Sequence, residues 1–133
     1  IDIYMPDAKY GSNTIAQALS RVSDYVEVNR AAIGEMHRQV GDLVIHDGIA
    51  VRGLLVRHLV LPENLAGSDI VLPWIADAIG TDTYVNIMDQ YHPAFRAADP
   101  GIAGYPALGR GITAQEYSAA MQIAHNAGLH RGF

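Results

Sequence analysis

The fold class is decided by the run GLLVRHLVL, which occupies residues 53–61. Its apolar, partly β-branched composition is typical of a strand that is buried on both faces of a parallel sheet. Two further strands are expected, one over residues 1–6 and one over residues 83–88. Each of the three is followed by residues with the helical period.

The helical segments have clear start and stop signals. A short helix is expected over residues 14–19, and a longer one follows Ser23 as N-cap and stops at Gly41. The next helix covers residues 68–80 and contains Pro73, which removes a backbone donor and predicts a delayed start or a kink. The last follows a capping box, Thr113 with Glu116, and runs to about Asn126.

This alternation predicts an α/β fold: three βα units of a partial (β/α) TIM-like barrel with parallel strands. A complete eight-unit barrel needs about 250 residues, whereas this chain has 133. We therefore expect residues 1–133 to form a single domain.

Composition excludes several classes of function. The net charge of −5 provides no basic face for nucleic acid. Two arginines interrupt the most apolar stretch, residues 48–62, so no membrane span is expected, and without a signal-peptide pattern a cytoplasmic location is expected. The chain has no cysteine and therefore no thiolate ligands for an iron–sulfur cluster. Its single lysine is Lys9.

Unusual polar residues collect where the predicted strands end, the edge at which α/β proteins place functional groups. Asp7 and Lys9 follow the first strand, and Asp89 and His92 follow the third. Asp7 and Lys9 alone fit an ordinary solvated turn, and His92 alone fits packing against the next residue. Arg57 lies among apolar residues of the second strand and is expected to be out of bulk water, with an anionic partner. That partner is either a structural carboxylate or a ligand carboxylate, and we favour the ligand.

The histidines give no metal-ligand spacing. His58 points to the face opposite Arg57, so a structural role is expected. His46 with Asp47 lies at the amino-terminal side of the sheet, which serves stability more than chemistry. The remaining histidines at helix ends are expected on the surface: His37, His125 and His130.

Three ordered blocks resemble one family. They are residues 2–10 (DIYMPDAKY), 56–62 (VRHLVLP) and 84–93 (YVNIMDQYHP), and residues 105–106 and 112–129 also fit. The chain resembles, over nearly its whole length, radical S-adenosylmethionine (SAM) proteins similar to pyruvate formate-lyase activating enzyme.

The resemblance implies roles for individual residues. Asp7 and the Met5 carbonyl would help to bind a monovalent cation beside SAM. Lys9 would lie near SAM or substrate and is the candidate catalytic residue. Arg57 would hold the SAM carboxylate, and His92 would line the SAM pocket. Residues 63–64 (Glu-Asn) stand where the activating enzymes tend to have Pro-Gly, a departure that concerns the partner-protein surface and not the SAM contacts.

In this family a three-cysteine cluster loop and a glycine-rich SAM motif precede the first block. The chain is therefore expected to be a C-terminal fragment. By resemblance, the intact protein would bind a 4Fe–4S cluster and SAM and generate a deoxyadenosyl radical, acting on a glycyl radical enzyme or another protein substrate. The fragment alone is expected to be inactive, with an unpaired edge on its first strand that favours self-association.

Three alternatives stay open. A lysine at a strand end also fits a Schiff-base aldolase, with Lys9 as nucleophile and Asp7 as proton shuttle. A metal-dependent hydrolase could draw on Asp89 and His92, although no second histidine joins them. The lack of cysteine also fits a cluster-free, non-catalytic binding or scaffold module.

Overall fold

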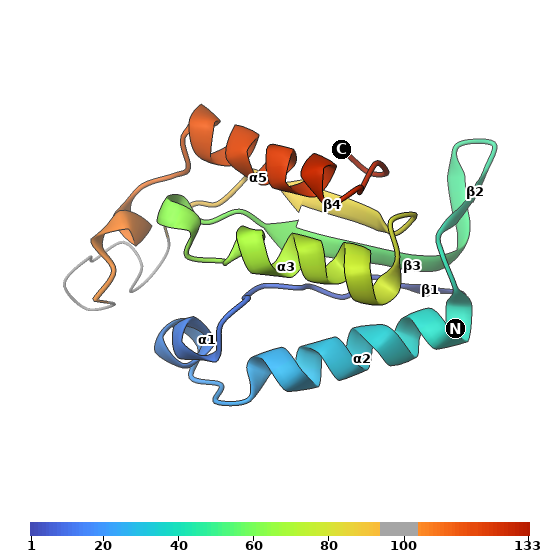
Figure 1. The fold of residues 1–133 in the computed structure, drawn as a ribbon, viewed down its shortest axis with the longest axis horizontal. Coiled ribbons are helices and arrows are strands. Elements are labelled where there is room, and N and C mark those ends of the chain that lie inside the picture. The colour runs from blue at the N-terminus through green and yellow to red at the C-terminus, as the bar shows by residue number, and fades with distance from the viewer. Residues whose placement is uncertain (94–103) are drawn as a thin grey trace.

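The computed structural model describes residues 1–93 and 104–133. Within them, a four-stranded sheet carries helices on one face (Figure 1). The strands are β1 (Ile3–Tyr4), β2 (Val44–His46), β3 (Ile49–Leu59) and β4 (Tyr84–Met88). The α-helices are α1 (Asn13–Ser20), α2 (Tyr25–Val40), α3 (Ser68–Trp74) and α5 (Ala114–Asn126). A π-helical turn, Ile75–Ile79, extends α3 to Gly80.

The sheet is mostly parallel, and β3 is its centre. β1 and β4 pair with β3 in parallel, and β2 pairs with it antiparallel. This confirms the α/β class and the parallel pairing of the three predicted strands. The described residues form an open sheet and no closed barrel.

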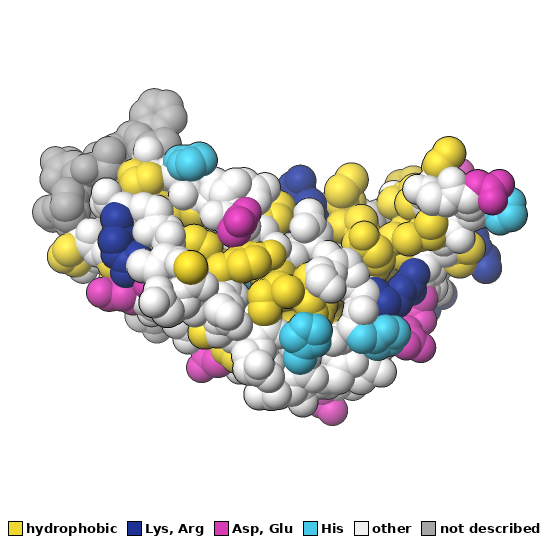
Figure 2. Space-filling view, turned by 90° about the horizontal axis from the view of Figure 1, so that it is seen from above, with side chains coloured by type: hydrophobic (Ala, Val, Ile, Leu, Met, Phe, Trp, Pro, Cys, Tyr) yellow, Lys and Arg dark blue, Asp and Glu magenta, His cyan; other side chains and the backbone are white. Residues whose placement is uncertain are grey.

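A β-hairpin, not predicted from the sequence, precedes the parallel part of β3. Asp47 and Gly48 form its turn, both with positive φ (51° and 76°), which matches the twist of a two-residue hairpin. His46 and Asp47 therefore lie at a hairpin tip, beyond the body of the sheet. Hydrophobic side chains are exposed at this end of the molecule (Figure 2): Val44, Ile45, Ile49 and Val51.

Gly53 marks the residue at which β3 changes partners. Its φ of 111° lies in the region that favours glycine. Before it, β3 pairs with β2; from Gly53 on, β3 pairs with β1, and from Leu55 on also with β4.

The core lies between the sheet and three helices. Leu54, Val56, Val85 and Ile87 point from β3 and β4 into it, and α2, α3 and α5 cover them (Figure 1). On the opposite face, Leu55, Arg57 and Leu59 are only partly buried. The expectation that this strand is buried on both faces is therefore wrong, because all the helices that pack on the sheet in the described residues lie on one side. We call this uncovered side the open face.

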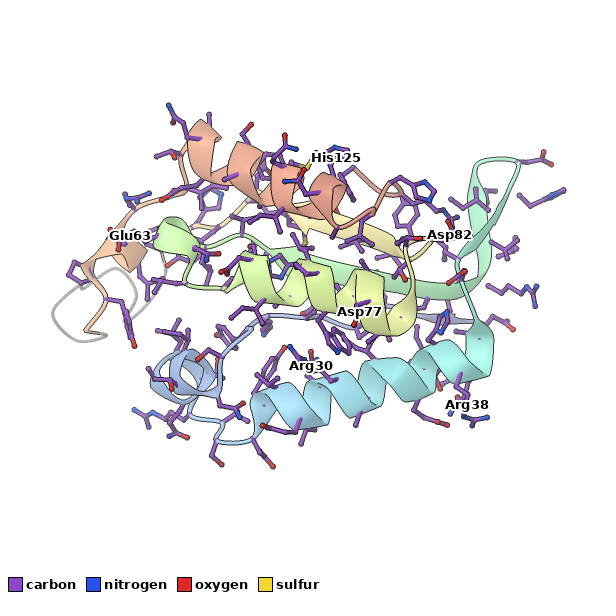
Figure 3. The ribbon with its side chains drawn as sticks, viewed as in Figure 1. Arg30, Arg38, Glu63, Asp77, Asp82 and His125 are labelled. Carbon is purple, nitrogen blue, oxygen red and sulfur yellow. The ribbon has the colours of Figure 1, made fainter. Side chains whose placement is uncertain are left out.

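The predicted helix boundaries agree closely with the structure. The N-cap of α2 is Asp24 and not Ser23, one residue later than expected, whereas Gly41 ends the helix as predicted. The capping box of Thr113 and Glu116 is confirmed. Arg30 of α2 reaches α3, where its guanidinium lies 5.0 Å from the centre of the Trp74 ring (Figure 3). No helix of the described residues is long and apolar enough to cross a membrane.

Candidate functional site

An ion pair between Asp7 and Arg57 occupies the open face at the carboxyl ends of β1 and β3. The Arg57 Nε donates a hydrogen bond of 2.7 Å to Asp7 Oδ1, and the two side chains are 41% and 32% exposed. The hydrogen bond and the charge of Asp7 raise the pKa of Arg57 above its ordinary value. Arg57 therefore has an anionic partner, as predicted. The prediction that it lies out of bulk water is wrong, and its Nε partner is a structural carboxylate, not the ligand that we favoured.

The terminal nitrogens of Arg57 remain available for a ligand. Neither has a hydrogen-bond partner among the residues that the structure describes. A guanidinium fixed through Nε presents its other donors in a fork that suits a carboxylate. Arg57 is thus an anchored guanidinium at the strand ends, with its two terminal nitrogens as the donors left for a ligand.

Asn86 belongs to the same row of side chains and was missed by the sequence reading. A β-bridge joins Asp7 to Arg57, and the β3–β4 register pairs Arg57 with Asn86. Paired residues of neighbouring strands share a face and lie about 4.8 Å apart. Three strands therefore present a carboxylate, a guanidinium and an amide side by side. This row of three side chains follows from the pairing of the strands, and the sequence of any one strand does not show it.

His58 lies on the core side and has no exposed surface, which confirms its predicted placement opposite Arg57. Its Nδ1 lies 2.6 Å from the Ala8 carbonyl oxygen and its Nε2 lies 2.8 Å from the Ser68 Oγ. Because a carbonyl only accepts, Nδ1 carries the proton and Nε2 accepts from the serine hydroxyl. Burial lowers the pKa of His58, which favours this neutral form.

The other predicted site residues lie near the strand ends without contacting the ion pair. Lys9 and His92 are exposed, and no hydrogen bond within the described ranges joins either side chain to Asp7 or Arg57. Met5 is 56% exposed on β1's side of the sheet. Tyr91, next to His92, donates to the Leu108 carbonyl at 2.8 Å, and burial, followed by the nearness of Tyr10, raises its pKa. The segments after β1 and β4 are therefore neighbours.

Metal-ligating side chains do not gather within residues 1–93 and 104–133: no group of three or more histidine, aspartate or glutamate residues could hold an ion there. His37 pairs with Asp42 and His130 with Asp82, each at 2.8 Å with partly exposed side chains. Figure 3 shows Asp82 on the segment that leads into β4, far along the sheet from Glu63 at the other end.

The loop after β3 is held in a strained conformation. Glu63 and Asn64 both have positive φ (54° and 55°), a conformation that asparagine adopts readily but that is costly for glutamate. Glu116 of the capping box accepts from the Glu63 backbone N–H at 2.9 Å and also pairs with Arg110 at 2.8 Å. The hydrogen bond from Arg110 holds the pKa of Glu116 well below its usual range. Tertiary contacts thus fix the loop in spite of its residue types.

We expect Glu63→Gly to stabilise the protein. Glycine adopts the left-handed region without the side-chain penalty of about 1–2 kcal/mol, but it also raises the entropy of the unfolded chain by about 0.4–1 kcal/mol, so the net gain is about 0.5–1 kcal/mol. Urea unfolding of the two proteins measures it. Glu63→Ala is the control, since it removes the carboxylate and keeps the strain. Equal stability of the glycine and alanine variants would contradict the strain account.

The fold and site define an α/β protein with a one-sided, mostly parallel sheet and an anchored guanidinium at the strand ends. No family model and no solved structure matches the chain. An uncharacterized protein of Methanocaldococcus jannaschii is 30% identical over 132 residues, which cover 97% of this chain and 33% of that protein. The chain thus spans one third of the length of the curated relative that it matches.

Proposed function

We propose that this chain is the C-terminal part of a radical SAM protein resembling pyruvate formate-lyase activating enzyme, and that its open face binds SAM. The supporting observation is Arg57, whose terminal nitrogens lack a partner among the described residues while its Nε is fixed by Asp7. In this proposal Arg57 binds the SAM carboxylate at the carboxyl ends of the parallel strands. The finer architecture, a segment of a partial TIM-like barrel, is part of the same proposal, since the open face would be the inner wall.

The described residues fit SAM better than they fit a cation. Lys9 and His92 are exposed near the same strand ends, where they could contact other parts of the ligand. Asp7 is already neutralised by Arg57, so the monovalent cation site that we expected at Asp7 and the Met5 carbonyl fits poorly.

The chain has no cysteine, so any 4Fe–4S cluster would need ligands from residues outside this sequence. When bound together, cluster and SAM would supply a one-electron reductive cleavage of the sulfonium. This chain's residues would hold the amino-acid end of SAM and line one side of the pocket. We therefore expect the chain alone to bind SAM without cleaving it.

Calorimetric titration of SAM tests the role of Arg57. We expect Arg57→Ala to weaken SAM affinity about thirtyfold, because a charge-assisted hydrogen bond to a carboxylate contributes about 2 kcal/mol. Arg52→Ala is the matched control: it removes an exposed arginine from the hairpin half of β3 and should leave the affinity unchanged. SAM affinity that survives Arg57→Ala would remove Arg57 from this role.

One alternative is favoured by a specific observation. Ile1, Ile3 and Met5 are exposed beside the edge of β1, which has no strand partner on its outer side within the described residues. Such an edge suits a cluster-free binding module or self-association, and in the first proposal it suits docking of a glycyl radical enzyme or other protein substrate. The Schiff-base reading is weaker, because Lys9 is exposed, whereas nucleophilic lysines are activated in apolar pockets or by a neighbouring cation.

A further inference from the structure

The backbone of the segment 7–9, which carries Asp7 and Lys9, is held on both sides. The Ala8 N–H donates to the Arg57 carbonyl at 2.8 Å, which continues the pairing of the strands. Three further backbone groups of the segment bind side chains. The Asp7 carbonyl accepts from Asn29 Nδ2 at 2.9 Å and from the Tyr25 hydroxyl at 3.4 Å. The Lys9 N–H donates to the same hydroxyl at 2.7 Å.

The Ala8 carbonyl accepts from His58 Nδ1 at 2.6 Å. His58 is itself fixed from behind by Ser68 at the start of α3. Thus Tyr25 and Asn29 from α2, with His58 from β3, hold three consecutive residues of the segment that follows β1. Burial raises the pKa of Tyr25, so its hydroxyl remains a donor.

His58 is fully buried, and Tyr25 and Asn29 are half-buried. Asn29 interrupts the apolar stripe of α2, and His58 is fully buried beside core residues. Burying polar groups costs free energy unless they are hydrogen-bonded, and an apolar core needs none of them. All three side chains bind the backbone of the segment 7–9. This segment sets the position of Asp7 relative to Arg57.

We propose that Tyr25, Asn29 and His58 are positioning residues for the ligand site: they fix the segment 7–9 so that Asp7 binds Arg57 Nε and leaves the terminal nitrogens for a ligand carboxylate. They act through Asp7 and do not touch the ligand. The effect on SAM rests on the function proposed above, whereas the effect on Arg57 does not.

Two replacements of His58 separate positioning from simple packing. Asparagine places its amide N–H near the position of Nδ1, so His58→Asn can keep the bond to Ala8. Glutamine reaches the position of Nε2, so His58→Gln can keep the bond to Ser68 and loses the one to Ala8. A packing role predicts similar behaviour of the two variants. Positioning predicts that only His58→Asn retains the wild-type site.

The test follows the Arg57 Nε–H signal by nitrogen-15 NMR in the folded variants, assigned by its loss in Arg57→Lys. In Asn29→Ala, Tyr25→Phe and His58→Gln we expect this signal to shift and its hydrogen exchange to accelerate about fivefold, the effect of one lost hydrogen bond. SAM affinity should fall by a similar factor. His58→Asn should resemble the wild type. Tyr4→Phe, which removes a hydroxyl bond to Gln39 at the other end of α2, is the matched control and should change neither.

An unchanged Arg57 signal in folded Asn29→Ala and His58→Gln would overturn the positioning role. If the signal changes as expected but the wild type does not bind SAM, the positioning role stands and the proposed SAM function fails. Equal effects of His58→Asn and His58→Gln would also overturn it, in favour of packing.

Discussion

Replacing Gly53 with alanine is expected to cost about 4 kcal/mol or more, a large share of the roughly 5–15 kcal/mol by which a domain is stable. The added Cβ would collide with the Asp42 carbonyl oxygen and lie 2.5 Å from the Leu43 Cα. Both are backbone atoms and cannot turn away as a side chain can. Alanine would also have to adopt a φ of 111°.

Urea unfolding monitored by circular dichroism measures this loss. Gly34→Ala is the control, since Gly34 lies in α2 with open space around its Cα. Alanine there should stabilise the protein by about 0.5–1 kcal/mol. A Gly53→Ala variant within about 1 kcal/mol of the wild type would show that β3 does not need this approach of two backbones.

His58→Leu is expected to destabilise the protein by about 3 kcal/mol, although leucine is apolar and similar in size. It leaves the Ala8 carbonyl and the Ser68 hydroxyl without their partner, and each buried polar group left unpaired costs about 1–3 kcal/mol. Thermal and urea unfolding measure the change. A variant as stable as the wild type would mean that water replaces the imidazole.

The same variant tests how pH acts through His58. Because burial lowers the pKa of His58 in the folded state, the unfolded chain binds the proton first as the pH falls through about 6.5. The contribution of neutral His58 to stability is therefore complete above that pH. It is lost as the pH falls toward the pKa that His58 has in the folded state. Between pH 7 and 5 the wild type should lose more stability than His58→Leu. Equal losses would contradict the lowered pKa.

Local signals in the sequence predicted most of the elements. The period of α2, its stop at Gly41 and the Thr113–Glu116 box depend on neighbouring residues only, so they could be read directly. The hairpin was missed although Asp47-Gly48 is a strong turn signal, and the strand was expected to begin only at Gly53. In the structure Arg52 is exposed on the part of the strand that projects beyond the helices.

The site was predicted less completely, because its contacts join distant residues. The sequence of one strand was enough to predict that Arg57 has an anionic partner. It could not identify Asp7 as that partner, because the pairing joins residues 50 positions apart. Asn86 depends on a second register, between β3 and β4. Asn29 was noticeable in the sequence as a polar residue that interrupts the apolar stripe of α2. Only the structure shows that it binds the Asp7 carbonyl. The places of SAM, the cluster and the partner protein stay predictions.

The central place of β3 also bears on how the chain folds. Each of β1, β2 and β4 pairs with β3 and with no other strand of the sheet that the structure describes. Within residues 1–133, β1 can therefore find no partner strand until the middle of β3 has been synthesised. Before that point, this part of the chain can form only α1 and α2. Short helices without tertiary contacts are marginally stable in water. Pairing across 50 residues has a high contact order, so we expect folding to be slow and to begin with the local hairpin at β2 and β3.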